Sequence, residues 1–380
     1  MKQTDALGNV TSFSYDGNGN QLGQVSVVAI APGVLRTNVT QTAYDANGHP
    51  VAVTDAEGHT TRTTYDALGN TAATTDALGR INRFLYADRG QLLSTVFADG
   101  TSNRLAYDAA GRRTNSTDRA GRTSSYDYDA LGRLISTTYP DGARTRTVYD
   151  LAGRVITQFD ERTNRTAFTY DHDGRQVAVT NALNAVTRSE YDQAGRKIAD
   201  LDALGRTTRF VYDELGRRIH TLFADGTTNT TVYDSLGRVA VEVDQAGVSN
   251  AFSYDSLGRL ISVTNALGTA NQTVTVYAYN ESGNLTRQQD ALNRVTHYEY
   301  DGLGRHVASV LPLGQRSGTL YNPVGDVAAV TNFNRDVIRF DYDANNRLTA
   351  KSLPDGTSVH YAYTLTGRRD AITNGTNVTL

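Results

Sequence analysis

Short runs rich in threonine, valine, isoleucine, tyrosine and phenylalanine alternate along the whole chain with turns that contain aspartate and glycine. Each run is about six residues long, a length and composition that favour strands over helices. No segment has a sustained apolar stripe with a period of 3.6 residues. A helical interpretation would also place a glycine about every ten residues inside helices, at about 1 kcal/mol each. The pattern therefore predicts an all-β protein.

A tyrosine returns every 21 residues, and 14 of the 16 intervals between the recurring tyrosines have this length. A period this strict is typical of a repeat architecture. The recurring tyrosines are Tyr15, Tyr44, Tyr65, Tyr86, Tyr107, Tyr128, Tyr149, Tyr170, Tyr191, Tyr212, Tyr233, Tyr254, Tyr279, Tyr300, Tyr321, Tyr342 and Tyr363.

The repeat reads Tyr-Asp-x-x-Gly-Arg, followed by a short run, a second Asp-x-x-Gly or Asp-Gly turn, and a threonine-rich run. Asp follows the tyrosine in 13 of 17 copies, Gly stands four places after it in 16, and Arg five places after it in 11; the one departure from Gly is Asn346. Asp can bond its own backbone at the start of a turn, and Gly accepts positive φ at its end. The predicted structural positions include the turn residues Gly132, Gly153, Gly174, Gly195, Gly216, Gly237, Arg133, Arg154 and Arg238.

Two strands and two turns in 21 residues predict one β-hairpin per repeat. We therefore predict one array over residues 1–380 of about 17 tandem hairpins, a long curved antiparallel sheet without a separate catalytic domain. Two repeats are longer, at 16–44 and 255–279, because residues 21–40 and 268–275 contain insertions that we expect to lengthen strands or turns at one rim. Modest apolar content predicts a thin sheet without a thick core.

A second period of 42 residues lies on the first. Two residues before the tyrosine, alternate copies have an aromatic residue at Phe84, Tyr126, Phe168, Phe210 and Phe252, so alternate hairpins place two aromatics on one face. Because 42 residues is near the length of one four-stranded blade, a β-propeller is the alternative fold. About nine such pairs would exceed the usual number of blades, and a propeller does not explain why the two turns of each repeat are so similar.

Composition narrows the partners. The formal charge is −3, from 37 basic and 40 acidic residues, which indicates neither a nucleic-acid nor a membrane-surface partner. Most arginines stand beside Asp in the turns, and we interpret them as a solvated ladder of Arg–Asp pairs from turn to turn in preference to a ligand site. Cysteine is absent, the first residues do not form a signal peptide, and no 18-residue apolar run predicts a membrane span.

The sequence contains no recognisable catalytic or metal-binding arrangement. The seven histidines are scattered, without His-Glu-x-x-His spacing, and Gly-x-Ser-x-Gly is absent. Residues 16–20 begin like a calcium loop, but Gln21 and Val27 occupy positions where the loop needs other residues. The pair Asp171 and Asp173 occupies an ordinary turn of its repeat. We therefore predict no catalytic, cofactor-binding or metal-binding residues, no cofactor, and no enzyme activity.

The motif at a 21-residue period resembles the YD repeats of Rhs proteins, the shell subunits of tripartite insecticidal toxins and the teneurins. Residues 149–154 (Tyr-Asp-Leu-Ala-Gly-Arg) and 233–238 (Tyr-Asp-Ser-Leu-Gly-Arg) are close matches, and the resemblance covers essentially the whole chain. It implies a strip of hairpins that spirals into a hollow shell, which in bacterial members encloses a C-terminal toxin. Those shells usually end at an Asp-Pro cleavage site, whereas none of the six prolines here follows Asp.

These observations favour a non-enzymatic structural segment of an Rhs/YD-repeat shell. The alternative is an extracellular adhesive surface for a carbohydrate or a partner protein. The chain begins and ends inside the repeat, since residues 5–8 (Asp-Ala-Leu-Gly) already form a turn motif. We therefore expect its first partner to be the remainder of a longer polypeptide, including an enclosed toxin domain. The resemblance also implies a secreted or cell-surface location.

Overall fold

The chain folds into strands joined by turns. The computed structural model describes residues 1–4, 10–31, 33–374 and 377–379, and in these residues it contains 36 strands and no helix. The predicted all-β class is confirmed. The turn motif at residues 5–8 lies outside the described residues.

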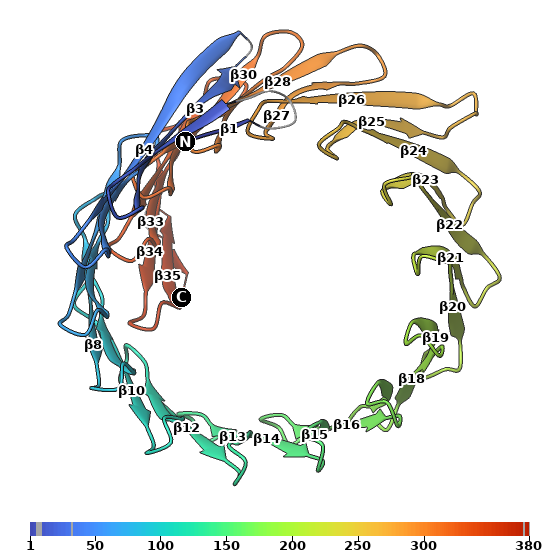
Figure 1. The fold of residues 1–380 in the computed structure, drawn as a ribbon, viewed down its shortest axis with the longest axis horizontal. Coiled ribbons are helices and arrows are strands. Elements are labelled where there is room, and N and C mark those ends of the chain that lie inside the picture. The colour runs from blue at the N-terminus through green and yellow to red at the C-terminus, as the bar shows by residue number, and fades with distance from the viewer. Residues whose placement is uncertain (5–9, 32, 375–376, 380) are drawn as a thin grey trace. The chain divides into compact units, whose positions relative to one another are not determined.

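Contacts divide the chain into two compact units. Unit 1 consists of Met1–Leu105, Thr117–Gly121 and Thr275–Leu380, and unit 2 consists of Ala106–Ser116 and Arg122–Val274. Figure 1 draws unit 2, from β12 to β25, as a curved strip of successive hairpins.

The strands before β12 are β1 (Lys2–Thr4), β2 (Val10–Tyr15), β3 (Gln21–Ala31), β4 (Val34–Tyr44), β5 (Pro50–Thr54), β6 (Thr60–Tyr65), β7 (Thr71–Thr75), β8 (Ile81–Tyr86), β9 (Leu92–Val96), β10 (Ser102–Tyr107) and β11 (Arg113–Thr117). The next strands are β12 (Thr123–Tyr128), β13 (Leu134–Thr138), β14 (Arg144–Tyr149), β15 (Val155–Phe159), β16 (Arg165–Tyr170), β17 (Gln176–Thr180), β18 (Val186–Tyr191), β19 (Lys197–Leu201), β20 (Thr207–Tyr212), β21 (Arg218–Leu222), β22 (Thr228–Tyr233), β23 (Val239–Val243), β24 (Ser249–Tyr254) and β25 (Leu260–Asn265). The last strands are β26 (Thr273–Tyr279), β27 (Leu285–Gln289), β28 (Val295–Tyr300), β29 (His306–Val310), β30 (Arg316–Tyr321), β31 (Val327–Thr331), β32 (Val337–Tyr342), β33 (Leu348–Ser352), β34 (Ser358–Tyr363), β35 (Arg369–Asn374) and β36 (Asn377–Thr379).

Each repeat is one hairpin, and neighbouring hairpins also pair with each other. In unit 2 every strand from β12 to β25 pairs antiparallel with the next strand along the chain. This ladder is not interrupted after four strands, as it would be between propeller blades. The propeller alternative is therefore wrong for unit 2.

A bulge recurs immediately after the conserved tyrosine. In the β14–β15 pair Val148 lies opposite Thr157, but Tyr149 lies opposite Val155, so two residues of β15 face one residue of β14. The same shift occurs at the corresponding tyrosine of the other repeats, for example between β12 and β13 and between β16 and β17. A bulge interrupts the ladder and increases the local twist. It therefore gives every hairpin the same bend next to its turn.

The turn directly after the tyrosine will be called the Tyr turn, and the turn that follows the second strand will be called the second turn. In the Tyr turn of residues 150–153, the Gly153 N–H donates to the Asp150 carbonyl over 3.1 Å, and Gly153 has φ of 85°. Gly132 and Gly237 both have φ of 80°. The predicted positive φ at these glycines is confirmed, as is the exceptional Asn346 at φ 58°.

The two faces of the sheet have almost no core between them. In the described residues the only hydrophobic side chains classed as buried are Val28, Ala199 and Ala308. Ala199 is 1% exposed because it is small and lies on one face between the longer Glu190 and Arg209 of the flanking strands. The expectation of a thin sheet is confirmed, so contacts between adjacent hairpins must supply most of the stability.

The first insertion lengthens a hairpin. Strands β3 and β4 have 11 residues each, compared with five or six in most of the other strands. The second insertion lies in the loop between β25 and β26, at the same end of its repeat. The expectation that insertions lengthen strands or turns is confirmed.

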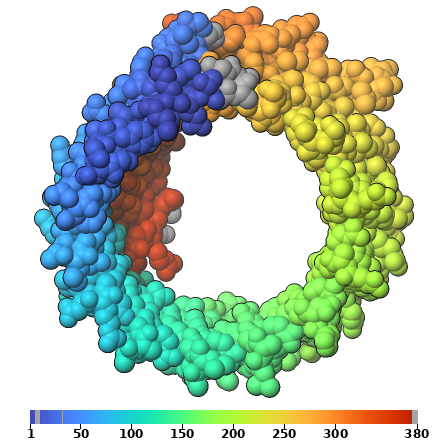
Figure 2. Space-filling view, in the orientation of Figure 1, coloured from blue at the N-terminus to red at the C-terminus, as the bar shows by residue number. Residues whose placement is uncertain are grey.

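The long β3–β4 hairpin brings together two parts of unit 1 that are far apart in sequence. Strand β3 contacts β28, and the Asn38 side chain donates to the Gly302 carbonyl over 2.8 Å. Figures 1 and 2 show the N-terminal residues, in blue, beside the orange residues that follow position 280. Nothing in the repeat pattern alone indicates this pairing.

Replacing Gly153 with valine should lower the free energy of unfolding by more than about 1 kcal/mol, because a β-branched residue is strained at positive φ. An added Cβ would meet only Arg133 Nη1 at 3.9 Å, so the cost should come from the backbone and not from a clash. Urea unfolding followed by circular dichroism would measure it. Leu151→Val, at a fully exposed position of the same turn (106%), is the matched control and should leave the midpoint unchanged.

Candidate functional site

The most developed arrangement of side chains is the junction between one repeat and the next. Its first member is the Tyr-turn aspartate, here Asp129. One carboxylate oxygen, Oδ1, accepts N–H donors of Leu131 (2.9 Å) and Arg133 (3.0 Å), and Oδ2 accepts Nε–H of Arg133 over 2.7 Å. The charged carboxylate therefore holds the turn closed and orients the arginine.

These donors change the acidity of the aspartate. The backbone N–H of Arg133, opposed in part by desolvation and assisted by the Arg133 side chain, lowers the pKa of Asp129 below its ordinary value. Hydrogen bonds to a carboxylate stabilise its ionised form. The same direction is found for the equivalent aspartates Asp108, Asp150, Asp192 and Asp234, for which the backbone N–H of the turn arginine is also the largest cause.

The arginine connects its own turn to the following repeat. While Nε of Arg133 bonds Asp129, Nη1 donates to the Asp150 carbonyl in the next Tyr turn over 3.1 Å. Its guanidinium carbon also lies 4.6 Å from the ring centre of Tyr149. Arginine suits this position because its planar, delocalised cation can stack on a ring while its N–H groups bond in the plane.

The tyrosine makes the return connection. The Tyr149 hydroxyl donates to the Leu134 carbonyl of the preceding repeat over 3.0 Å. Leu134 is the residue opposite Tyr128 at the preceding bulge, where the ladder is interrupted. The hydroxyl therefore satisfies a backbone acceptor next to the irregularity, which phenylalanine could not do.

The junction recurs through both units. Arginine lies over the next repeat's tyrosine at 4.4–5.3 Å in these described pairs: Arg112–Tyr128, Arg133–Tyr149, Arg154–Tyr170, Arg175–Tyr191, Arg196–Tyr212, Arg217–Tyr233, Arg238–Tyr254, Arg305–Tyr321 and Arg347–Tyr363. The hydroxyl bond to a backbone carbonyl recurs at these tyrosines: Tyr44, Tyr65, Tyr128, Tyr149, Tyr170, Tyr191, Tyr212, Tyr233, Tyr254, Tyr300, Tyr321, Tyr342 and Tyr363.

The positions singled out in the sequence are brought together only between adjacent repeats. Each tyrosine lies at the end of a strand, each glycine closes a Tyr turn, and each arginine follows that turn. The expected ladder of Arg–Asp pairs from turn to turn needs correction. Arg133 and Arg154 pair with Asp129 and Asp150 of their own turns, and the next turn contributes a backbone carbonyl.

Sequence reasoning missed the carbonyl acceptors and the bulge. Backbone acceptors leave no residue-type signal, so the role of the tyrosine hydroxyl could not be read from composition. The strict choice of Tyr, with no Phe at the recurring position, was the available indication that the hydroxyl forms a bond.

One repeat replaces the arginine by histidine. His49 Nδ1 lies 3.1 Å from Asp45 Oδ2, and its ring lies 4.7 Å from that of Tyr65. The imidazole thus occupies the arginine's place beside the aspartate and against the next tyrosine. Planarity is the property that the two side chains share here.

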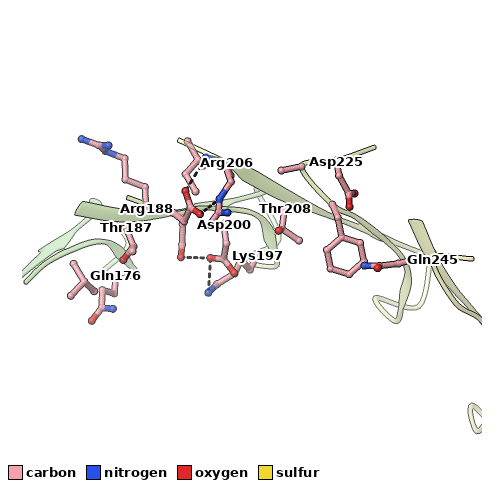
Figure 3. Close-up of a pocket in the computed structure, with 15 residues that line it drawn as sticks. Gln176, Thr187, Arg188, Lys197, Asp200, Arg206, Thr208, Asp225 and Gln245 are labelled. Carbon is pink, nitrogen blue, oxygen red and sulfur yellow. Dashed lines mark hydrogen bonds and ion pairs between the residues drawn. The ribbon is translucent and has the colours of Figure 1, made fainter. Parts of the chain in front are cut away.

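A shallow groove of about 690 Å³ lies in unit 2 (Figure 3). Lys197 and Asp200 of β19 and Thr208 of β20 contribute to it, with Gln176 and Gln245 farther along the strip. Asp200 Oδ1 accepts the Ser189 hydroxyl over 2.6 Å and lies 3.0 Å from Lys197 Nζ. The charged groups of the groove thus pair with each other.

Neither a metal cluster nor a membrane helix is found in the part of the chain that the structure describes. No three His, Cys, Asp or Glu side chains group there to hold an ion. With strands as its only regular elements, that part also has no helix of sufficient length and apolar character to cross a membrane.

Two family profiles match the sequence in register with these hairpins. The RHS Repeat family matches residues 44–81, 86–123, 107–144, 149–186 and 191–228, and the Teneurin YD-shell family matches residues 211–380. The chain belongs to the Rhs/YD-repeat family. Its hairpins are YD repeats, and the junctions described above are the contacts between successive YD repeats. No curated protein matches the sequence.

Solved structures show the same fold. A crystal structure titled TcdB2-TccC3-Cdc42 aligns with 99% of this chain and 26% of its own at 15% identity and a TM-score of 0.71. The Tc holotoxin pore of Photorhabdus luminescens aligns with 96% of this chain and 25% of its own at 16% identity and a TM-score of 0.69. The YD repeats of this chain therefore span about a quarter of the length of those solved chains.

Replacing Tyr149 with phenylalanine should lower the free energy of unfolding by about 1 kcal/mol, because the Leu134 carbonyl loses its donor. Urea unfolding would measure the change. Tyr139→Phe is the matched control: in the described residues the Tyr139 hydroxyl has no hydrogen bond, so this substitution should be neutral. Equal effects of the two substitutions would contradict the role given to the repeat hydroxyl.

Acid should weaken the fold. The pKa of Asp129 and of its equivalents is lowered in the folded state, so their contribution to stability is present above the unfolded pKa of about 4 and is lost as the pH falls through the folded pKa. The urea midpoint should be nearly constant from about pH 7 to 5 and should fall below about pH 4. A midpoint that stays constant down to pH 2 would show that the turn carboxylates do not matter.

Proposed function

We propose that the chain is a non-enzymatic structural segment of an Rhs/YD-repeat shell, and that the longer polypeptide to which it belongs encloses a toxin domain. The family profiles and the Tc-toxin structures of the same fold support this proposal. The segment contributes wall, and chemistry belongs to what the wall surrounds.

The observation that supports this proposal most strongly is the use of the polar side chains. In each complete junction, such as that between the repeats of Tyr128 and Tyr149, the Asp carboxylate, the Arg guanidinium and the Tyr hydroxyl bond to the same or the neighbouring repeat. A catalytic site needs groups that are held in place and yet free to reach a substrate. Here the recurring groups are committed to holding the strip together.

The adhesive alternative receives no comparable support from the groove of unit 2. Its aspartate is bonded by Ser189 and Lys197, so binding a carbohydrate hydroxyl at Asp200 would have to replace existing contacts. The groove is therefore compatible with a wall surface whose polar groups are internally satisfied.

Protease protection tests the proposal in the polypeptide that naturally contains these repeats. The segment that follows the repeats should resist trypsin while the repeats are folded. It should be digested at least about tenfold faster when Gly132, Gly153 and Gly174 are all replaced with valine, because three strained turns open the wall. Replacing Leu131 and Leu151 with alanine in the same turns is the matched control. Equal digestion in the parent and the triple variant would contradict enclosure.

A further inference from the structure

Lateral contacts within unit 1 pose a problem of register. Second turns of early repeats lie against Tyr turns of late repeats: Arg80 Nη1 donates to the Asp343 carbonyl over 3.2 Å, and the Glu57 carboxylate accepts the Gly302 N–H over 2.6 Å. Turns of one kind recur every 21 residues. A slip by one repeat, about 10 Å for two strands, would present another turn of the same backbone shape. Residues that depart from the repeat must therefore select the register.

Gly302 is the clearest departure. It stands two places after Tyr300, where the two neighbouring repeats have Glu281 and Pro323. Unlike Gly304 of the same turn, with φ of 74°, it has no positive φ that would require glycine. The turn itself thus does not explain this glycine.

The lateral contact does explain Gly302. A Cβ added there would lie 2.8 Å from both Asn38 Oδ1 and Glu57 Oε1 and 3.1 Å from Arg36 Cζ. Arg36 holds Glu57 in place by a 2.5 Å bond, and Asn38 donates to the Gly302 carbonyl over 2.8 Å. Both backbone polar groups of Gly302 are therefore bound by a pocket that only glycine can enter without displacing these side chains.

The neighbouring Tyr turns cannot replace this one. A slip that placed Glu281 opposite Glu57 would bring two carboxylates together and insert a side chain where there is no room. A slip in the other direction would place Pro323 there, and proline has no N–H for Glu57 to accept. The contact at Gly302 is thus unfavourable in both adjacent registers.

A second selective contact lies one repeat earlier. Asn280 stands where most repeats have aspartate, and its Nδ2 donates to the Ala29 carbonyl of the long hairpin over 2.8 Å, while Glu281 Oε2 accepts the Ala29 N–H over 3.0 Å. An ionised aspartate could not donate this bond. Asn280 Oδ1 still accepts the N–H groups of Ser282 and Asn284, so the asparagine keeps the turn while adding a donor. Asn280 is 5% exposed.

A third contact lies two repeats later. The Asn345 side-chain amide donates to Asp99 Oδ2. Position 324, the equivalent of Asn345 in the preceding repeat, is a valine and has no side-chain donor. A backward slip would therefore leave Asp99 without this partner.

We propose that Gly302, Asn280, Glu281 and Asn345 are register-setting residues, and that they select which late Tyr turns dock on β3, β4 and the second turns that contain Glu57 and Asp99. The partner recognised is a second segment of the same chain, and recognition uses backbone N–H and C=O groups that only these turns present without a clash. This inference goes beyond the proposed shell function, because it does not depend on what a shell would enclose.

Distance measurement between two nitroxide labels tests the proposal in the 380-residue chain, which has no native cysteine. Labels would be attached to Leu85→Cys and Leu320→Cys, both exposed in unit 1 (61% and 64%). The parent should give one distance. With Gly302→Glu, that distance should disappear or be joined by a population displaced by about 10 Å, the width of one repeat. Ala130→Glu is the control at the same turn position in unit 2 and should keep the parent distance.

A second variant separates register from bulk. Glu57→Ala adds no atoms to the Tyr turn, but it removes the acceptor and also the repulsion that Glu281 would meet after a slip. It should therefore add a displaced population while circular dichroism retains the β spectrum. If Gly302→Glu and Glu57→Ala both keep the single parent distance, these contacts do not set the register and the proposal is wrong.

Discussion

The contact on which the rest of the structure depends is the arginine of one repeat bound between its own turn and the tyrosine of the next. Arg133 bonds Asp129, donates to the Asp150 carbonyl and covers Tyr149, whose hydroxyl returns a bond to the preceding repeat. A hairpin of 21 residues cannot bury a core of its own, and a cation over an aromatic ring adds about 0.5–1 kcal/mol at an exposed site. Stability should therefore accumulate as a sum of nearest-neighbour junctions.

This dependence on neighbours explains why the motif is so uniform. A strained turn, a missing hydroxyl or a missing guanidinium weakens the contact with both adjacent hairpins, so each repeat is held to the same residue types. His49 shows which features the junction requires, since it keeps a planar group beside Asp45 and against Tyr65. The positions between the motif residues are free to vary, and the exposed leucines of many turns, such as Leu131 and Leu215, belong to this freer class.

Much of the fold could be predicted from the sequence, because its determinants are local. The period, the hairpins, the positive φ of Gly132 and the lengthened strands around residues 21–40 all follow from residue types within a few positions of each other. The tyrosine hydroxyl's acceptor could not be predicted, because it is the backbone carbonyl of Leu134 beside a bulge. The docking of β3 on β28 could not be predicted either, because no short-range pattern connects residues about 250 positions apart.

Repetition and lateral docking make opposite demands on the sequence. The junction between adjacent repeats favours identical copies, whereas docking between distant repeats needs copies that can be told apart. The chain meets both demands by keeping Tyr300, Asp301 and Gly304 of the Tyr turn unchanged and varying the residue between them, where Gly302 replaces a side chain. Asn280 follows the same logic, since it retains the oxygen that closes the turn and adds one donor for Ala29. In a repeat array, departures from the consensus that preserve the local turn are therefore the positions where long-range contacts should be sought.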